Sequence, residues 1–354
     1  MGTARAPKAF IDRLESWYGA HKRDLPWRRT SDPYRIWISE VMLQQTTVGA
    51  VIPFYKAWMS RFPNVKALAG APLQSVLKAW QGLGYYQRAR NLHAASREIV
   101  AAHRGKIPAD HDVLMRLPGF GPYTAAAVAS LAFDKPHPVV DANVRRVMMR
   151  ILHLPGEADG RHDKAIEAAL VRLMDRRSPG TFNQAMMELG ALVCRPRAPL
   201  CAACPLPDLC LAYERGEQEV IPKPKERITK KEKAVVGIIR KGSRILIQQR
   251  PAKGLFAGLW EFPGGKVERD ETLEQALARE LREELDAGMK DARFLLEVKH
   301  TYTQFQVALY AYAVRLKDEP ALEAGRRKWV TIKALRDYPF PSGSAKIVRF
   351  LENS

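Results

Sequence analysis

Cysteine, acidic residues and long apolar runs are all scarce in this chain of 354 residues. Its four cysteines lie between positions 194 and 210, which argues against disulfides spread over a fold and indicates one local metal site in a reducing compartment. No apolar run approaches the roughly 18 residues that a membrane-spanning helix needs. The first ten residues contain no apolar segment of the kind found in secretory signals. We therefore expect a cytoplasmic protein with no membrane partner.

Acidic residues are outnumbered by basic ones. The 38 Asp and Glu stand against 57 Lys and Arg, which gives a formal net charge of +19 and a sequence pI near 9.9. Such an excess suits a polyanionic partner, although it also raises solubility without any partner. The length exceeds what one hydrophobic core usually supports. Two domains are therefore expected.

The N-terminal half shows helical patterns and no alternating strand pattern. Residues 10–193 read as successive short helices, and helix-start signals stand at Asp32, Asp110, Gly121 and Asp141. Aspartate caps the free N–H groups of a first helical turn, and proline fits the first helical position. The sequence therefore predicts an all-helical first domain.

The C-terminal half has a different pattern and follows a segment rich in proline and lysine. Residues 234–239 and 244–249 predict a hairpin, residues 272–285 a helix and residues 305–312 another strand. The segment before them has no apolar periodicity and predicts an extended, charged linker. This half is therefore α+β. The predicted boundaries are 1–221 for the helical domain, 222–232 for the linker and 233–354 for the α+β domain.

The cysteines Cys194, Cys201, Cys204 and Cys210 follow the spacing C-x6-C-x2-C-x5-C. This spacing is compact enough for four thiolates to converge on one centre. Zinc sites with four cysteines usually pair two C-x2-C units, and this chain has one. Taken alone, the spacing leaves zinc and an iron-sulfur cluster both open.

Residues 117–125, LPGFGPYTA, place two glycines, Gly119 and Gly121, in a tight turn directly before a helix. Backbone N–H groups at such a turn can bind a phosphate, and the positive end of the helix dipole adds to that attraction. A Gly-Pro turn is weak evidence on its own, because it can simply join two helices.

Glu40 stands on the helix that begins after Asp32. Ile36 and Trp37 lie one turn before it and Leu43 one turn after, so its carboxyl shares a face with apolar groups. Apolar surroundings raise the pKa of a carboxyl group. A lone glutamate is more often an ordinary surface residue, so its importance depends on the motif around it.

These features together resemble the MutY-type adenine DNA glycosylases, which belong to the helix-hairpin-helix superfamily that also contains endonuclease III. The resemblance covers about residues 10–215 and is specific. It implies an enzyme that excises adenine mispaired with 8-oxoguanine, and also with guanine, from double-stranded DNA in base excision repair. The matching runs are residues 25–27 (LPW), 37–46 (WISEVMLQQT), 82–86 (GLGYY), 117–125, 140–144 (VDANV) and 182–190 (FNQAMMELG).

The resemblance also assigns roles to residues. Excision needs an acid that protonates the adenine at N7 and an anion that stabilises the cationic sugar. By the resemblance, Glu40 is the acid and Asp141 is the stabilising anion, and Tyr123 and Asn143 organise these carboxylates. Capping a helix is compatible with the role of Asp141, because it would hold the carboxylate in place.

The same resemblance implies the contacts with DNA and the cofactor. The extruded adenine would occupy a pocket formed by Trp27, Arg28, Leu43 and Gln184, although buried apolar side chains are more often plain core. Gln45 and Tyr85 match residues that are inserted into the duplex, and Gly119 and Gly121 match the phosphate-binding hairpin. The cysteine spacing resembles the one that holds a 4Fe-4S cluster in this superfamily. In that case Cys194, Cys201, Cys204 and Cys210 are the ligands.

Tyr123 separates this chain from relatives that also cut the DNA strand. Endonuclease III carries a lysine at the matching position, and that lysine forms a Schiff base. A tyrosine has no amine with which to form one. A glycosylase without lyase activity, acting as a monomer, is implied.

The second half contains the Nudix box. Residues 265–284 fit G-x5-E-x7-R-E-U-x-E-E, and the preceding WEFPGGK resembles MutT. Glu280, Glu283 and Glu284 share one helical face, where they would repel unless Mg²⁺ or Mn²⁺ joins them. Salt bridges to Arg279 and Arg282 could neutralise the same carboxylates without a metal. Asp286 stands where the family has glycine, which questions the helix exit.

A further match points to lesion recognition by this domain. Tyr302, Thr303 and Gln304 align with the loop that senses 8-oxoguanine in the family, where Phe-Ser-His is usual, and Thr303 retains a hydroxyl. Two other functions stay open. One is a nucleotide pyrophosphohydrolase whose helical half only binds DNA, and the other is a non-catalytic iron-sulfur protein that binds DNA.

Overall fold

The computed structural model describes residues 5–224, 230–302, 305–321, 323 and 325–353. Backbone contacts divide the chain into two compact units. One contains Met1–Gly70 and Asn91–Glu226, and the other contains Ala71–Arg90 and Arg227–Ser354. Residues 71–90 are thus grouped with the C-terminal residues, which the sequence patterns did not indicate. The predicted domain boundaries stay a prediction, and each unit is described by itself below.

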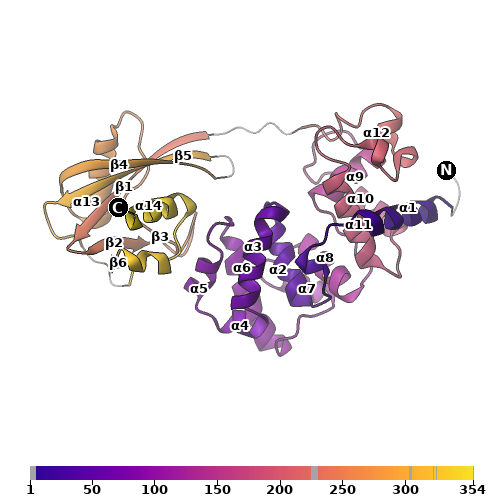
Figure 1. Ribbon diagram of the computed structural model, residues 1–354, viewed down its shortest axis with the longest axis horizontal. Helices are drawn as coiled ribbons and strands as arrows, with labels where there is room; N and C mark the ends of the chain where they lie inside the picture. Colours follow the sequence, from indigo (N-terminus) through magenta and orange to yellow (C-terminus); the bar gives the residue numbers. More distant parts are fainter. Residues whose placement is uncertain (1–4, 225–229, 303–304, 322, 324, 354) are drawn as a thin grey trace. The chain divides into compact units, whose positions relative to one another are not determined.

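The N-terminal half is helical, as predicted: before Lys230 the described residues form no strand. The helices are α1 (Arg5–His21), η1 (Pro26–Arg28), α2 (Pro33–Leu43), α3 (Val48–Arg61), α4 (Val65–Gly70), α5 (Leu73–Ala79), α6 (Gln87–His103), α7 (His111–Arg116), α8 (Pro122–Phe133), α9 (Ala142–Ile151), α10 (Asp163–Leu173), α11 (Pro179–Leu192), η2 (Cys201–Ala203), η3 (Pro207–Leu209) and α12 (Leu211–Glu214), where η marks a 3-10 helix (Figure 1).

Helix starts follow the capping signals in the sequence. The carboxylates of Asp32, Asp110 and Asp141 each accept a hydrogen bond from a first-turn backbone N–H, at 2.8, 2.9 and 2.6 Å. Proline is the first residue of both α2 and α8, where its missing N–H costs no hydrogen bond. These caps fix where α2 and α9 begin, and the functional side chains described below stand on or beside those two helices.

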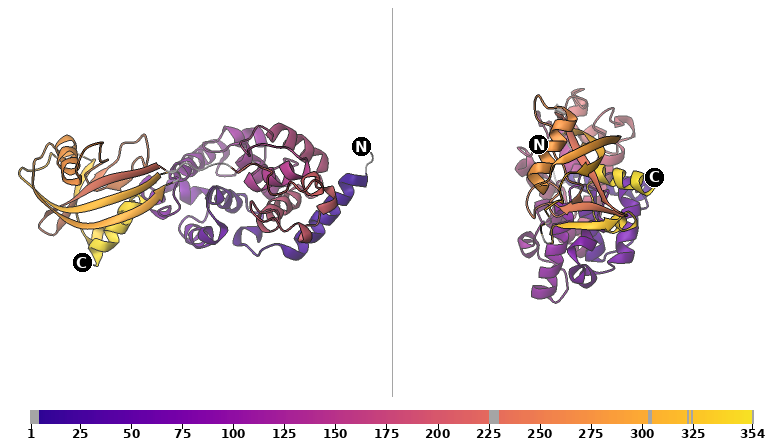
Figure 2. Two further views of the ribbon diagram at one scale, coloured as in Figure 1. Left: turned by 90° about the horizontal axis from the view of Figure 1, so that it is seen from above. Right: turned by 90° about the vertical axis from the view of Figure 1, so that its left-hand side faces the viewer.

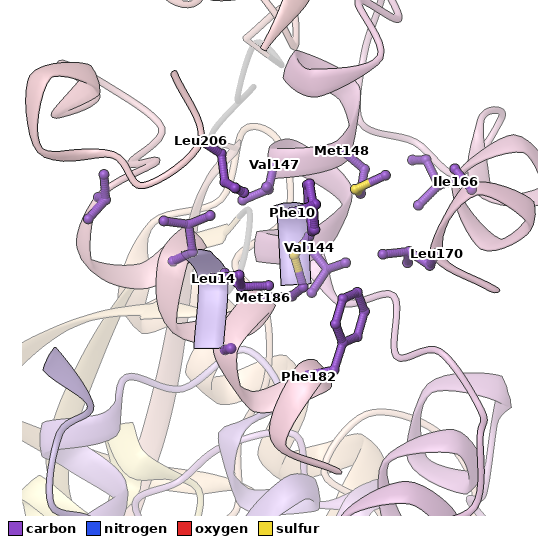
Figure 3. Close-up of a cluster of buried hydrophobic side chains, with 14 of the residues drawn as sticks. Phe10, Leu14, Val144, Val147, Met148, Ile166, Leu170, Phe182, Met186 and Leu206 are labelled. Carbon is purple, nitrogen blue, oxygen red and sulfur yellow. The ribbon is translucent and has the colours of Figure 1, made fainter. Parts of the chain in front are cut away.

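Helices α1, α9, α10 and α11 enclose a hydrophobic core beside the cysteine-rich loop. Figure 3 shows side chains from these helices converging, and Leu206 of the loop joins them. The labelled members are Phe10, Leu14, Val144, Val147, Met148, Ile166, Leu170, Phe182, Met186 and Leu206. Because α9 buries its apolar face here, its N-terminus and Asp141 are held in a fixed position.

Two glycines of α11 allow close packing of this helix against α8 and α9. A Cβ atom on Gly180 would lie 2.7 Å from the backbone oxygen of Ser130 in α8. One on Gly190 would lie 2.6 Å from the Cβ of Asn143 in α9. Real Cβ atoms do not approach so closely, so a larger residue at Gly190 would displace Asn143.

The second unit contains a mixed sheet. Its strand order is β3-β2-β1-β5-β4, with β6 also paired to β2; β1 and β5 are parallel and the other pairs antiparallel. The strands are β1 (Lys230–Lys241), β2 (Arg244–Gln249), β3 (Trp260–Glu261), β4 (Met289–Tyr302), β5 (Phe305–Leu316) and β6 (Arg327–Thr331). The predicted hairpin is confirmed, because Lys241 pairs with Arg244 across a two-residue turn.

Helices cover both faces of this sheet. Helix α13 (Leu273–Leu285) packs Leu277 and Leu281 against one face. Helix α14 (Ser342–Glu352), preceded by the 3-10 helix η4 (Lys333–Asp337), packs Ile347 and Leu351 against the other. Figure 2 shows the two helices on opposite sides of the sheet. Strand β1 is buried on both faces, which explains its continuous apolar run.

The start of β1 differs from the sequence prediction, and the end of α13 answers the question that Asp286 raised. Strand β1 begins at Lys230, within the predicted linker, because its backbone already pairs with Phe305 of β5 while the lysine side chain is exposed. Asp286 ends α13 in the left-handed conformation, with φ of 51°. Aspartate tolerates this conformation better than most residues do, so the helix exit survives the loss of the usual glycine.

Candidate active site and cysteine cavity

A pocket of about 740 Å³ opens in the helical unit between α2, α8, α9 and α11. Its walls contain the four residues that the sequence assigned to catalysis: Glu40, Tyr123, Asp141 and Asn143. They come from separate parts of the chain, and the packing of α8 and α11 around α2 and α9 brings them together. The pocket also contains Trp27, Arg28, Leu43, Gln45 and Gln184, which the sequence assigned to DNA or the extruded base.

Glu40 is a buried carboxylate of the pocket, with 4% of its surface exposed. Burial raises the pKa of Glu40 to about 7, and the nearby charge of Asp141 adds to this rise. The hydroxyl of Tyr123 donates a hydrogen bond to Glu40 Oε2 and counteracts part of it. A carboxyl group with this pKa can carry a proton at neutral pH, as a general acid must.

Asp141 has a different environment. Its carboxylate accepts hydrogen bonds from the backbone N–H of Val144 at 2.6 Å and from Asn143 Nδ2 at 2.9 Å. Burial raises the pKa of Asp141, and these two donors act against that rise by stabilising the anion. The environments of these two carboxylates therefore differ: burial favours the protonated form of Glu40, whereas Asp141 has hydrogen-bond donors that stabilise its anionic form.

Asn143 is itself held by an arginine from the next turn of α9. Arg146 donates to Asn143 Oδ1 at 2.9 Å, to the backbone oxygen of Gly190 at 2.8 Å and to that of Cys194 at 2.8 Å. One guanidinium thus joins the amide beside Asp141 to the first cysteine of the loop. The sequence prediction missed Arg146.

The opposite wall contains a buried ion pair that the sequence prediction also missed. Glu188, only 1% exposed, accepts hydrogen bonds from the guanidinium groups of Arg23 and Arg28 at 2.6 to 2.9 Å. Burial would raise the pKa of Glu188, but these donors lower it to about 2. Arg28 is therefore held in place at the pocket wall.

The remaining predicted contact residues divide into two groups. Trp27 is buried with its ring edge against Tyr55 at 5.3 Å between ring centroids, and Leu43 lines the pocket beside it. Gln45 is exposed and Tyr85 is 42% exposed, and both have a positive φ, 56° and 50°. Non-glycine residues rarely adopt this conformation, and those that do cluster at functional sites.

The predicted hairpin lies between α7 and α8. Gly119 has φ of 77°, and a Cβ atom there would lie 2.4 Å from the Cβ of Asn91, so the position requires glycine on both counts. Gly121 is the N-cap of α8 and has no side chain to block its N-terminus. A glycine turn directly before a helix is the kind of site where backbone N–H groups bind a phosphate.

The four cysteines line one cavity together with apolar side chains of α9, α11 and the loop. Burial raises the pKa of the Cys204 thiol to about 11, and burial also raises that of Cys201 and Cys210. Four thiolates there would need a cationic centre between them. Among the residues that the structure describes, no three His, Cys, Asp or Glu side chains gather closely enough to hold a single metal ion.

Arg150 ties the cysteine loop to α9. Its buried guanidinium donates to Cys194 Sγ at 3.2 Å, to the backbone oxygen of Arg195 at 2.8 Å and to that of Ile221 at 2.7 Å. Arg150 thus places a positive charge beside a cysteine sulfur. The cavity, its sulfur donors and this charge therefore fit an anionic, sulfur-bound metal cluster.

Comparison with known proteins agrees with this site. Residues 38–176 match the model of the HhH-GPD superfamily of base excision DNA repair proteins, and residues 234–349 match that of the NUDIX domain. The adenine DNA glycosylase of Homo sapiens is 35% identical to this chain, over 96% of the chain and 73% of the human protein. The chain belongs to the adenine DNA glycosylase family.

Two solved structures resemble the glycosylase. A thermostable thymine-DNA glycosylase is 31% identical with a TM-score of 0.54, covering 60% of this chain and 98% of that one. A trapped covalent intermediate of endonuclease III with DNA is 25% identical with a TM-score of 0.53, covering 61% and 99%. The protein is therefore a DNA-binding N-glycosylase of base excision repair. In the described part of the chain, no helix is long and apolar enough to span a membrane.

The second unit of the glycosylase has a pocket of about 430 Å³ beside the Nudix box. Glu280 and Glu284 line it, together with Glu261, Arg250 and Lys266. Burial raises the pKa of Glu261 to about 7 despite its ion pair with Arg250. Glu284 accepts a hydrogen bond from the backbone N–H of Gly264 at 2.8 Å.

The three Nudix glutamates do not converge. Arg279 binds Glu280 at 2.9 Å and lies 3.6 Å from Glu283, whose side chain is 61% exposed. The neutralisation by salt bridges that the sequence left open is thus present for Arg279. The residues predicted to sense the lesion lie outside the described residues, namely Thr303, Gln304 and the side chain of Tyr302.

Proposed function

We propose that this glycosylase excises adenine mispaired with 8-oxoguanine or guanine, that it has no lyase activity, and that it acts as a monomer. One observation carries the proposal: Glu40, with a pKa of about 7, and the hydrogen-bonded carboxylate of Asp141 line the same pocket. Its volume is sufficient for one extruded base.

Glu40 would supply the proton. Adenine leaves a deoxyribose slowly as an anion and more readily when a proton is delivered to N7. Burial keeps Glu40 protonated for part of the time at neutral pH, and Tyr123 fixes the direction of its carboxyl group through Oε2. The deoxyribose then becomes cationic as the glycosidic bond breaks.

Asp141 would stabilise that cation. The N–H of Val144 and the amide of Asn143 hold its carboxylate at the start of α9, and Arg146 holds the amide. Because these donors are already in place, the negative charge needs no reorganisation when the cation forms. Water then adds to the sugar and leaves an abasic site.

Tyr123 supports the absence of strand cleavage. A lyase step needs an amine that attacks the sugar carbon, and the matching position of this pocket has a phenol bonded to Glu40. Burial raises the pKa of Tyr123 well above its usual value, so the phenol stays neutral and serves as a hydrogen-bond donor.

The cysteine cavity would hold a 4Fe-4S cluster through Cys194, Cys201, Cys204 and Cys210. When bound, the cluster would supply a rigid, sulfur-ligated centre that fixes the loop containing Arg195 and Arg197 for contact with phosphates. Arg150 already fixes the chain at Cys194 and Arg195 through its own hydrogen bonds.

A glycosylase assay tests the proposed function. Duplexes that pair adenine with 8-oxoguanine, guanine or thymine are incubated with the protein, and strand length is measured with and without alkali. We expect excision opposite 8-oxoguanine and guanine, little opposite thymine, and strand breaks only after alkali. Breaks without alkali, or an adduct trapped by borohydride, would show that the protein is a lyase.

We further propose that the C-terminal domain reads 8-oxoguanine through Tyr302, Thr303 and Gln304. This proposal rests on the resemblance of residues 302–304 to the lesion-sensing segment of the family. In the full-length protein, Thr303→Ala is expected to reduce the preference for 8-oxoguanine over guanine opposite adenine by about threefold to tenfold, since one hydrogen bond is lost. Thr301→Ala, in the neighbouring strand, is the control. An unchanged preference would exclude Thr303 from lesion recognition.

A second activity is favoured by the pocket of about 430 Å³, where Glu280 and Glu284 lie with Arg250 and Lys266. Acidic side chains can bind Mg²⁺ or Mn²⁺, and the basic ones can bind phosphates. We propose slow hydrolysis of a nucleoside triphosphate, with Glu280, Glu283 and Glu284 as the metal ligands. Arg279 would have to release Glu280 and Glu283 for this.

Phosphate or pyrophosphate release from oxidised dGTP, with Mg²⁺ or Mn²⁺ present, tests this activity. We expect Glu284→Gln in the full-length protein to reduce release at least about tenfold, because a ligand to the cation is lost. Glu297→Gln, which leaves the Nudix box intact, should release product at the wild-type rate. If wild type and Glu284→Gln share the background rate, and calorimetry detects no metal binding, the box has only a structural role.

A further inference from the structure

Tyr18 of α1 lies behind the wall of the excision pocket. Its side chain is buried, with 5% of the residue exposed, and its hydroxyl donates a hydrogen bond to Gln184 Oε1 at 2.5 Å. Gln184, on α11, lines the pocket directly. The two residues are 166 positions apart in the sequence, so this bond exists only because α1 packs against α11.

A glutamine side chain has two different ends. Its carbonyl oxygen accepts hydrogen bonds, whereas its NH₂ group donates them, and rotation by 180° exchanges the two. Tyr18 faces Gln184 as a donor, since burial raises the pKa of the phenol and keeps it protonated. The side-chain nitrogen of Lys22 and the guanidinium of Arg28 each lie 5.7 Å from the centre of its ring. Nearby cations make a phenol a better donor.

The neighbouring groups of this wall are also fixed. Both carboxylate oxygens of Glu188 accept hydrogen bonds from Arg23 and Arg28. Glu188 therefore has little capacity left to accept a bond from a base, and Arg28, which lines the same wall, has donors and no acceptor in its side chain. The groups that remain for an extruded base are mainly donors.

We propose that Tyr18 is a positioning residue for base recognition. By holding the carbonyl end of Gln184, it directs the NH₂ end into the pocket, so that this wall selects a base edge with an unprotonated ring nitrogen. Adenine offers such nitrogens. The inference rests on the proposed adenine excision and names a specificity determinant of the same pocket.

Single-turnover excision of adenine opposite 8-oxoguanine tests the inference in the full-length protein. Tyr18→Phe keeps the ring beside Arg28 and removes only the hydroxyl. We expect the rate constant to fall about tenfold, which corresponds to one hydrogen bond lost in the transition state. Affinity for a duplex with a non-cleavable adenine analogue, and the active fraction measured by burst amplitude, should stay within about twofold of wild type.

Two further variants separate orientation from packing. In a Gln184→Ala background, Tyr18→Phe should cause no additional loss, because its effect acts through the amide. Gln184→Glu keeps an oxygen for the Tyr18 hydroxyl but replaces the donor end by a second acceptor, and it should lose about as much activity as Tyr18→Phe. Tyr34→Phe is the control, since it removes another buried hydroxyl, bonded to the backbone oxygen of Phe62 at 2.7 Å.

The outcomes have distinct meanings. A wild-type protein that does not excise adenine would overturn the proposed function itself. An active wild type with an equally active Tyr18→Phe, or a fully active Gln184→Glu, would overturn the inference alone. Equal losses in Tyr18→Phe and Tyr34→Phe, with a reduced active fraction in both, would also overturn it, because the effect would then be one of stability.

Discussion

Replacing Glu40 with glutamine is expected to reduce adenine excision by about 10²- to 10⁴-fold, the usual contribution of a positioned general acid. Glutamine has nearly the same shape and keeps an oxygen to accept the Tyr123 hydrogen bond, but it has no acidic proton to deliver to the base. Burial raises the pKa of Glu40 to about 7 because it penalises the charged carboxylate. Glutamine is neutral and carries no such penalty, so the replacement should not destabilise the fold. Duplex affinity should stay within about tenfold, since it depends mostly on phosphate contacts.

The measurement is the single-turnover rate constant on a duplex that pairs adenine with 8-oxoguanine. Glu15→Gln is a matched control, because Glu15 is a partly buried glutamate that accepts a hydrogen bond from Ser178 at 3.1 Å outside the pocket. It should excise adenine at the wild-type rate. Robust turnover by Glu40→Gln would remove Glu40 from the mechanism.

Asp141→Asn is expected to reduce the same rate constant by about 10²- to 10³-fold, because a fixed negative charge beside the developing cation is lost. Asparagine caps helices as well as aspartate does, so the hydrogen bond from the N–H of Val144 can persist. The thermal midpoint should therefore change little while the chemistry fails. This separates the charge of Asp141 from its structural role in α9.

Asp110→Asn makes the same exchange at the N-cap of α7, away from the pocket. It should leave excision unchanged. If Asp141→Asn and Asp110→Asn lost activity or thermal stability to the same extent, Asp141 would be a cap and nothing more. An Asp141→Asn protein with wild-type turnover would have the same consequence.

The local features of this fold could be predicted from the sequence because they depend on neighbouring residues. Asp32, Asp110 and Asp141 cap helices within three positions of themselves, and the hairpin after Lys241 needs only Gly242 and Ser243. The matching motifs also assign Glu40, Tyr123 and Asp141 to one site, and the three residues line the same pocket. Their roles stay predictions.

Interactions across the chain could not be predicted in this way. Glu188 stood inside a quoted motif without a role, because its partners Arg23 and Arg28 lie 165 and 160 positions away. A signal was present, since Glu188 lies between Met187 and Leu189 on a buried helix, where an unpaired carboxylate would be costly. Arg146 and Arg150 gave a similar signal, because they lie one turn apart among the buried residues of α9.

In the Nudix helix the sequence pattern predicts the packing but not the side-chain pairing. Its periodicity separates Leu277 and Leu281, which pack in the core, from three glutamates on another face. Sharing a face does not fix where each carboxylate lies. Arg279 forms ion pairs with Glu280 and Glu283, whereas Glu284 accepts a hydrogen bond from the backbone N–H of Gly264. Side-chain pairing of this kind depends on rotamers that periodicity does not specify.

The pH dependence of adenine excision tests the central claim, that Glu40 is the acid, most directly. The acid acts only when protonated, and burial places its pKa at about 7. The wild-type single-turnover rate constant should therefore be level just below neutrality, where Asp141 is still an anion, and fall about tenfold per pH unit above neutrality. Glu40→Gln should show only a low rate without this fall. A wild-type rate constant that stays level up to pH 9, or a Glu40→Gln protein with the same fall, would contradict the account.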